Sequence, residues 1–298
     1  KNLIYIAGPT GVGKTDLSIE IAKKFNTDIV SCDSRQFYKE LKIGTSPPSN
    51  TQLSEVKHHF IHNKSIHDKY NVGEYEKDAI TLLNNLFKEK ENLVLVGGSG
   101  LYADSIMFGI DDFPDVPSDI RNNIIANFNS GGLEVLQDKL KKLDPEYSEQ
   151  VDLNNYKRII RALEIIEFTG KKFSSQRTNK EKQRVFQSHI LIIERDREEL
   201  YKKINDRVDK MIKGGLEEEA FKLKDFKELN TMNTVGYKEF FNYFDNKLTY
   251  IQTVEKIKQS TRNYAKRQIT WLKKYKKPIN VYCDQEVESI INKLNQVI

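Results

Sequence analysis

The stretch that decides the fold reads Leu3-Ile4-Tyr5-Ile6-Ala7-Gly8-Pro9-Thr10-Gly11-Val12-Gly13-Lys14-Thr15. Its first five residues form a continuous apolar run, which is typical of a parallel strand buried on both faces. The next eight satisfy the pattern G-x-x-x-x-G-K-[ST], and Leu17, Ile21 and Ala22 follow at helical spacing. A strand, a glycine-rich turn and a helix in this order predict a loop that binds a diphosphate or triphosphate.

Each residue type in this loop has a chemical reason to be there. Glycines let successive N–H groups point at one anion, Lys14 adds a positive charge, and the hydroxyl of Thr15 is a ligand for Mg²⁺. The predicted phosphate-binding residues are Gly8, Thr10, Gly11, Val12, Gly13, Lys14 and Thr15. The pattern does not distinguish ATP from another compound that ends in a diphosphate.

The rest of the chain alternates strands and helices on both sides of a purely helical stretch. Further strands are expected at 28–32, 93–96, 189–193 and 279–282, with helices at 79–87, 197–226 and 254–275. Between them, helices are expected at 118–128, 133–143 and 155–168, followed by an exposed linker at 171–182. We therefore expect an α/β protein. Its P-loop NTPase-like parallel sheet core, flanked by helices, comprises residues 1–111 and 186–298, and an all-helical insertion domain comprises residues 112–185.

Composition narrows the class of protein. With 298 residues, 38% hydrophobic and 31% charged, the chain is too apolar to be disordered and too polar for a membrane protein. Cys32 and Cys283 are the only cysteines, which favours a reducing compartment. No apolar run reaches eighteen residues, and the apolar run near the first residue is too short for a signal peptide. We therefore expect a cytoplasmic protein without membrane contact, and a monomer in the simplest case.

Positive charge is concentrated near the carboxyl end. Residues 253–277 hold nine Lys or Arg and one acid, Glu255, a net +8, whereas the whole chain carries +5. Such a helix either lies against a polyanion or is a solvated lysine-rich face, and charge alone leaves both interpretations open.

Two polar residues follow predicted strands. Asp33 ends the second strand and Ser99 the third, at the edge of the sheet where open parallel sheets place their functional sites. Asp33 could accept a proton, hold Mg²⁺ through water, or cap a following helix. Ser99 could touch phosphate, or cap the helix that starts near Gly100. ATP hydrolysis would require an acid after a neighbouring strand to hold Mg²⁺, but none follows the strand at 93–96. Glu194, at the end of the strand at 189–193, is the remaining candidate for that acid.

Four of the five histidines, His58, His59, His62 and His67, lie within ten residues. A metal site is the tempting interpretation, because His58 and His62 are four residues apart. No cysteine accompanies them and Asp68 is adjacent to only one, so a structural role is favoured.

Several segments, taken together, resemble the tRNA dimethylallyltransferase family. They are Gly8 to Thr15, Asp33 to Tyr38, Ile43-Gly44-Thr45, Val96 to Tyr102, Arg158 to Glu164, Val235 to Glu239 and Lys266 to Leu272. The P-loop is common to many enzymes, but its combination with Lys-Arg-Gln-Ile-Thr-Trp at 266–271 is highly specific.

The resemblance implies transfer of a dimethylallyl group from its diphosphate to N6 of adenosine 37, next to the anticodon of tRNA. It implies that the P-loop holds the donor diphosphate with Mg²⁺, that Asp33 is the general base, and that Ser99 and Arg121 belong to the reaction site. The residues it implies for contact with the anticodon stem-loop are Asp33, Ser34, Arg35, Gln36, Lys157, Arg158, Arg161, Gly236, Tyr237, Lys238, Lys266, Arg267, Gln268, Trp271 and Lys273. Trp271 on its own is better explained as a core residue, since Leu272 and Tyr275 mark the same apolar side.

Three other functions are each opposed by a feature of the sequence. The same chemistry on free AMP or ADP would need neither the basic helix nor the insertion. A small-molecule kinase that uses ATP would need the acid missing after Val96. A nucleotide-gated RNA-binding protein without catalysis would leave Asp33 without a role.

Overall fold

The computed structural model describes residues 1–178 and 180–298, which form two compact units. One unit comprises Lys1–Phe108 and Gln183–Ile298, and the other Gly109–Lys182. The junctions therefore lie three residues before the predicted boundaries at 112 and 185. Within the described ranges, no helix combines the length and apolarity needed to cross a membrane.

A six-stranded parallel sheet forms the first unit, in the order β3-β2-β4-β1-β5-β6. The strands are β1 (Asn2–Ala7), β2 (Ile29–Ser31), β3 (His58–His59), β4 (Asn92–Val96), β5 (Gln187–Glu194) and β6 (Ile279–Tyr282). The predicted α/β class is thereby confirmed. The edge strand β3, which consists of two histidines, was not predicted, because two residues are too few for a periodic pattern.

The apolar run of β1 is explained by its central place in the sheet. Leu3, Tyr5 and Ala7 belong to the hydrophobic core on one face, and Ile4 and Ile6 to the core on the other. All five are at most 1% exposed. Because alternate side chains of a strand point to opposite faces, a strand covered on both faces must be apolar throughout.

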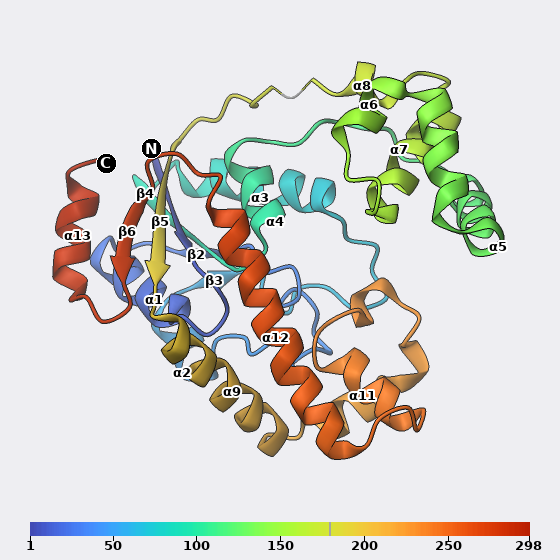
Figure 1. Ribbon diagram of the computed structural model, residues 1–298. Helices are drawn as coiled ribbons and strands as arrows, with labels where there is room; N and C mark the ends of the chain where they lie inside the picture. The colour runs from blue at the N-terminus through green and yellow to red at the C-terminus, as the bar shows by residue number, and fades with distance from the viewer. Residues whose placement is uncertain (179) are drawn as a thin grey trace. The chain divides into compact units, whose positions relative to one another are not determined.

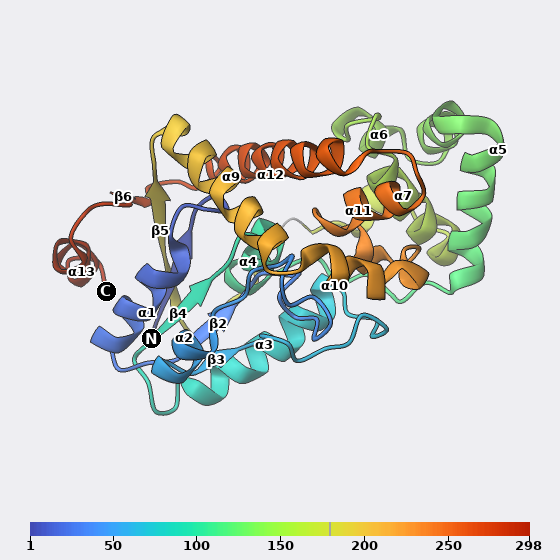
Figure 2. The ribbon, with the colours of Figure 1, turned by 90° about the horizontal axis from the view of Figure 1, so that it is seen from below.

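Helices cover both faces of this sheet. They are α1 (Lys14–Lys24), α2 (Asn50–Glu55), α3 (Val72–Leu86), α4 (Gly100–Met107), α9 (Arg197–Lys213), α10 (Leu216–Lys222), α11 (Tyr237–Phe244), α12 (Tyr250–Leu272) and α13 (Val287–Asn295), with 3₁₀ turns η1 (Lys224–Phe226) and η2 (Asn230–Met232). Both ribbon views show α9 and α12 side by side (Figure 1, Figure 2).

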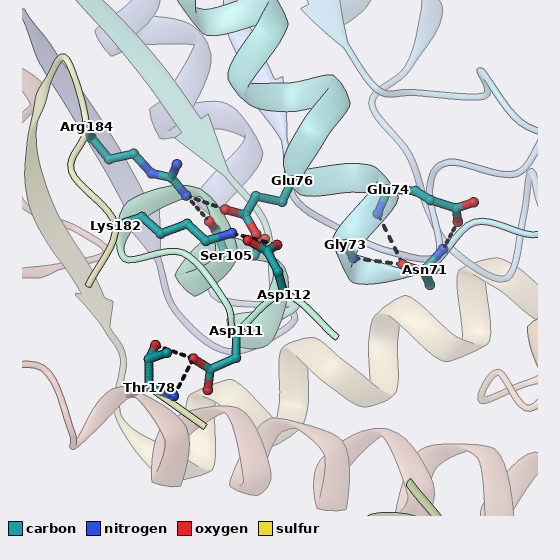
Figure 3. Close-up of polar contacts among 10 residues, drawn as sticks. All are labelled: Asn71, Gly73, Glu74, Glu76, Ser105, Asp111, Asp112, Thr178, Lys182 and Arg184. Carbon is teal, nitrogen blue, oxygen red and sulfur yellow. Dashed lines mark hydrogen bonds and ion pairs between the residues drawn. The ribbon is translucent and has the colours of Figure 1, made fainter. Parts of the chain in front are cut away.

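Local sequence signals explain where these helices begin and end. The helix predicted at 197–226 is wrong as one element, because the chain turns at Gly214-Gly215, where Gly215 has a φ of 94°. The helix predicted at 79–87 begins earlier, at Val72, because Asn71 and Glu74 form a capping box (Figure 3). Thr249 and Gln252 form another at the start of α12.

The second unit is helical, as predicted, with α5 (Ser118–Leu143), α6 (Pro145–Gln150), α7 (Tyr156–Thr169) and α8 (Phe173–Gln176). Gly132, with φ 73° and ψ −169°, breaks α5 into the two predicted helices. The linker predicted at 171–182 is only partly correct, because it contains α8 and buries Phe173. Its residue Asn179 lies outside the described residues.

Polar contacts fix the chain where it leaves and re-enters the first unit (Figure 3). On re-entry, the Arg184 guanidinium pairs with Glu76 at 2.6 Å and donates to the carbonyl oxygen of Ser105 at 2.7 Å. Within the helical unit, Asp111 accepts from the backbone N–H of Thr178 at 3.0 Å, and Lys182 pairs with Asp112 at 3.0 Å. The outgoing and returning segments of the insertion are therefore joined at its base.

Candidate active site

A cavity of about 1010 Å³ opens at the carboxyl ends of β1, β2 and β4. The P-loop forms its floor, and Asp33 and Gly97-Gly98 follow the neighbouring strands. Side chains of α9 and α12 close it from the other side. This volume is at the upper end of what small-molecule sites have, so the cavity has room for more than a phosphate group.

The P-loop is shaped by glycine and closed by a buried valine. Gly11 and Gly13 have φ angles of 82° and 108°, which other residues rarely adopt. Val12 is fully buried beneath the loop, and its N–H donates to the carbonyl oxygen of Pro9 at 3.3 Å. Gly13 is the N-cap residue of α1 and has no side chain to cap it, so the first amides of α1 and the positive end of its dipole are directed to the cavity.

Lys14 lies at the centre of this charge distribution. Its Nζ donates to the carbonyl oxygens of Gly8 and Pro9, both at 2.9 Å. Desolvation by the surrounding protein lowers the pKa of Lys14 to about 8, Asp33 opposes that shift and Arg207 adds to it. An anion bound here would favour the charged form of the lysine.

Asp33 and Ser99 follow the neighbouring strands β2 and β4, and hydrogen bonds link Ser99 to Ser34. No helix follows Asp33; its Oδ1 instead accepts from the N–H of Arg35 at 3.1 Å, which forms an Asx turn. Ser99 is the N-cap residue of α4, yet its hydroxyl accepts from the N–H of Ser34 at 3.1 Å and lies 3.0 Å from the Ser34 hydroxyl. The two predicted caps are thus used to shape the turn that presents Asp33 to the cavity.

The segment Gly97-Gly98-Ser99-Gly100 lets α12 approach the end of β4. A Cβ on Gly98 would lie 2.2 Å from Nε2 of Gln268, and one on Gly100 would lie 2.3 Å from the Trp271 ring. In this close packing the N–H of Thr10 donates to Oε1 of Gln268 at 2.8 Å, and Nε2 of Gln268 donates to the carbonyl oxygen of Gly98 at 2.8 Å. Gln268 therefore joins the P-loop, β4 and α12.

Arg207 on α9 is a site residue that the sequence did not reveal. It lines the cavity, and its Nη2 donates to the carbonyl oxygen of Thr45 at 3.3 Å. Burial lowers the pKa of the Arg207 guanidinium, and the charge of Asp33 counteracts this effect. In the sequence, Arg207 is one of many charged residues on an amphipathic helix, and only the fold distinguishes it from the exposed ones.

The residues predicted to contact tRNA divide into groups. Arg35 and Gln36 support the turn after Asp33, since Gln36 donates to the carbonyl oxygens of Thr45 and Ser46 at 3.3 and 3.2 Å. On α12, Lys266, Arg267 and Trp271 line a surface hollow of about 420 Å³ together with Thr270 and Lys274. Gln268 faces the P-loop, and Lys273 lines a different cavity, so the structure does not bring these two to that hollow.

The other predicted RNA contacts lie on α11 and in the helical unit. Gly236 caps α11 and Lys238 is exposed, but Tyr237 is fully buried, which places its ring out of reach of solvent. Lys157, Arg158 and Arg161 are exposed on α7. The guanidinium of Arg121 pairs with the buried carboxylate of Glu164 at 2.9 Å, and Arg161 pairs with the same carboxylate at 3.3 Å.

Glu194 and the histidine cluster were the remaining candidates, for ATP hydrolysis and for metal binding. Glu194 lines a separate cavity beside β6, so the acid suggested for ATP hydrolysis is not in the wall of the P-loop cavity. His59 bonds Asp28 at 2.8 Å, and a ring nitrogen of His58 bonds the carbonyl oxygen of Val56 at 2.8 Å. In the part of the chain that the structure describes, no three His, Cys, Asp or Glu residues are grouped to hold a metal ion.

The chain is similar to the members of one enzyme family over most of its length. The family model for IPP transferase matches residues 36–275, which include Gln268 and Arg207. A tRNA dimethylallyltransferase of Christiangramia forsetii is 50% identical over 272 residues, which are 91% of this chain and 90% of that protein. The chain belongs to the IPP transferase family.

Further relatives match nearly the whole chain. A tRNA dimethylallyltransferase of Flavobacterium psychrophilum is 46% identical over 98% of this chain and 97% of its own length. The crystal structure of the full-length tRNA isopentenylpyrophosphate transferase of Bacillus halodurans covers 99% of this chain and 94% of its own, with 33% identity and a TM-score of 0.72. A eukaryotic dimethylallyltransferase acting on tRNA matches 99% of this chain and 77% of its own, with 26% identity and a TM-score of 0.78.

Proposed function

We propose that this enzyme transfers a dimethylallyl group from dimethylallyl diphosphate to N6 of adenosine 37 in tRNA. The observation that carries this assignment is the junction of the P-loop, Asp33 and Gln268 in one cavity, in a chain of the IPP transferase family. We also propose that the enzyme acts in the cytoplasm as a monomer. The same fold with AMP or ADP as acceptor is the second candidate, because a mononucleotide would also fit a cavity of about 1010 Å³.

The chemistry separates into three tasks. As the bond between the allylic carbon and oxygen breaks, its electron pair leaves with the diphosphate, and the loop amides, Lys14 and Arg207 stabilise that charge. N6 of the adenine forms the new bond to carbon and gives its proton to the carboxylate of Asp33. The base must first leave the stacked anticodon loop, and Tyr264 offers an aromatic surface on the cavity wall.

Magnesium fits the oxygen donors that line this cavity. The hydroxyl of Thr15 and the carboxylate of Asp33 are hard ligands, which Mg²⁺ prefers together with phosphate oxygens and water. Thr15 would hold the ion directly and Asp33 through water. A bound Mg²⁺ would neutralise part of the diphosphate charge.

Contact with the anticodon stem-loop is assigned to exposed cations and to the partly buried Trp271. We assign Lys266, Arg267 and Trp271 on α12, Lys238 on α11, and Lys157, Arg158 and Arg161 on α7 to this role. Lys274 lies 3.9 Å above the Trp271 ring, so this hollow combines cations with an aromatic face. Ser34, Gln268 and Tyr237 act through the residues that they support, and Arg121 remains a proposed member of the reaction site.

Product mass tests the assignment. The protein is incubated with dimethylallyl diphosphate, Mg²⁺ and either an unmodified anticodon stem-loop or AMP. A gain of one C5 unit on the RNA alone is expected. A gain on AMP alone would show that the acceptor is the mononucleotide and not tRNA. Consumption of ATP without any mass gain would support a kinase instead.

The salt dependence of RNA binding is expected to fall in two variants. Lys266→Ala and Arg267→Ala should each weaken binding of the stem-loop and reduce the slope of log K against log salt by about 1, because each removes one phosphate contact. Pyrophosphate affinity should not change. Lys293→Ala on α13 is the matched control and should leave the slope unchanged. Slopes equal to the wild-type slope in both α12 variants would show that this helix does not contact RNA.

Donor use is expected to decline as the pH rises through about 8, the pKa of Lys14. Below that pH the lysine is charged and binds diphosphate; above it the charge is lost, so kcat/KM for the donor falls. Lys14→Arg keeps its charge and should flatten this limb of the pH profile. A decline of the same size in Lys14→Arg would assign the titration to another group.

A further inference from the structure

Glu219 on α10 accepts an unusual number of hydrogen bonds. Its Oε1 accepts from the N–H groups of Ile43 and Gly44 at 2.9 and 3.1 Å, and its Oε2 from that of Lys42 at 3.1 Å. The Tyr237 hydroxyl donates to Oε1 at 2.5 Å. Three successive amides that surround one carboxylate form an anion-binding nest, so the loop and this side chain hold each other in place.

Tyr237 completes this contact from the other side. Its ring is fully buried, and a Cβ on Gly44 would lie 2.5 Å from it, so the backbone of the loop rests directly on the ring. Burial and the neighbouring Glu219 raise the pKa of Tyr237, which keeps its hydroxyl protonated and able to donate. Tyr237 follows Gly236 and precedes the exposed Lys238, within the segment assigned to RNA contact.

The loop that Glu219 holds is a wall of the donor cavity. Lys42, Ile43 and Ser46 line that cavity. Between them, the carbonyl oxygen of Thr45 accepts from Nη2 of Arg207 at 3.3 Å and from Nε2 of Gln36 at 3.3 Å. The position of this carbonyl therefore constrains Arg207, the cation that faces Asp33 and Lys14.

We propose that Glu219 is a positioning residue that ties the donor-cavity wall at 42–45, and through it Arg207, to Tyr237 in the segment that meets tRNA. This inference rests on the proposed function, since it assigns the diphosphate to the cavity that Arg207 lines. Its consequence is specific. Loss of the Glu219 contacts should weaken donor binding more than RNA binding, and Tyr237 should act on the donor only through Glu219.

The experiment is a double-mutant cycle in the full-length protein with Glu219→Gln and Tyr237→Phe. The amide in Glu219→Gln has one acceptor oxygen in place of two and brings N–H donors against the loop amides. We expect it to raise the donor KM and the pyrophosphate Kd by about 10-fold. Tyr237→Phe keeps the ring and loses only the hydroxyl, with an expected rise of about 3-fold. The double variant should match Glu219→Gln, because both substitutions break the same connection.

Control variants and a second readout separate positioning from stability. Glu218→Gln removes the same charge from the exposed neighbouring residue and should leave the donor KM unchanged. The Kd for the stem-loop should change less than twofold in Glu219→Gln. An unchanged pyrophosphate Kd, additive effects in the cycle, or an equal loss of pyrophosphate and RNA affinity would each overturn the proposal.

The proposal can still be tested if Glu219→Gln does not fold or if the wild-type protein shows no transfer. If Glu219→Gln does not fold, Tyr237→Phe alone decides, because an unchanged pyrophosphate Kd in that variant contradicts the connection. If the wild-type protein transfers no dimethylallyl group, the proposed function fails, whereas the pyrophosphate measurements still judge the role of Glu219.

Discussion

Asp33→Asn is expected to lower the turnover of dimethylallyl transfer by about 10²–10⁴-fold, the usual contribution of a general base. The amide keeps the size of the side chain and can still accept the hydrogen bond from the N–H of Arg35, so the Asx turn should persist. It cannot take the proton from N6. Single-turnover rates with saturating donor and stem-loop measure this effect without a contribution from binding.

The control for Asp33→Asn comes from the same cavity. Asp16 also lines it, and its carboxylate bonds Nε2 of Gln52 at 2.8 Å on the outer side of α1. Asp16→Asn removes the same charge and should leave the single-turnover rate within a few-fold of wild type. Equal losses in the two variants would mean that Asp33 contributes only to the net charge of the cavity, and an unchanged rate in Asp33→Asn would exclude it as the base.

The predictable part of this site is the part that is local in sequence. The P-loop combines a buried strand, glycines and a helix start within fifteen residues, so pattern and spacing suffice. The positions of Asp33 and Ser99 at this edge of the sheet could be predicted because each follows an apolar strand, and parallel strands end at one edge. Their detailed use could not be predicted, because the Ser99 hydroxyl serves Ser34, which is 65 residues away, in place of its own helix.

Long-range packing accounts for what the sequence did not reveal. Nothing near Arg207 in the chain indicates that Thr45 and Asp33 lie beside it. Tyr237 lies in a segment that resembles the family, yet its burial depends on Gly44, which no periodicity connects to it. Gln268 lies on α12 and Lys273 is the C-cap residue that follows it, and only the helix packing assigns them to different cavities.

Removal of the Arg207 guanidinium is the second large effect that we expect. Arg207→Ala should raise the donor KM by about 10–100-fold, the usual contribution of one or two hydrogen bonds to a charged group. It should also lower kcat, because the leaving diphosphate gains charge in the transition state and a cation in a desolvated site stabilises that charge. Steady-state kinetics with varied dimethylallyl diphosphate give both parameters, and pyrophosphate binding gives the ground-state part alone.

Two variants show which property of Arg207 matters. Arg207→Lys keeps the charge but replaces the planar fork, so one cation can no longer reach both the Thr45 carbonyl and the diphosphate; an intermediate KM is expected. Lys202→Ala removes an exposed cation from the same helix and should change nothing, because long-range charge alone is screened by salt. If Arg207→Ala raised the donor KM no more than Lys202→Ala, the cavity would bind diphosphate through the P-loop alone. The wall at 42–45 would then not act on the donor through Arg207, so this measurement also bears on the role of Glu219.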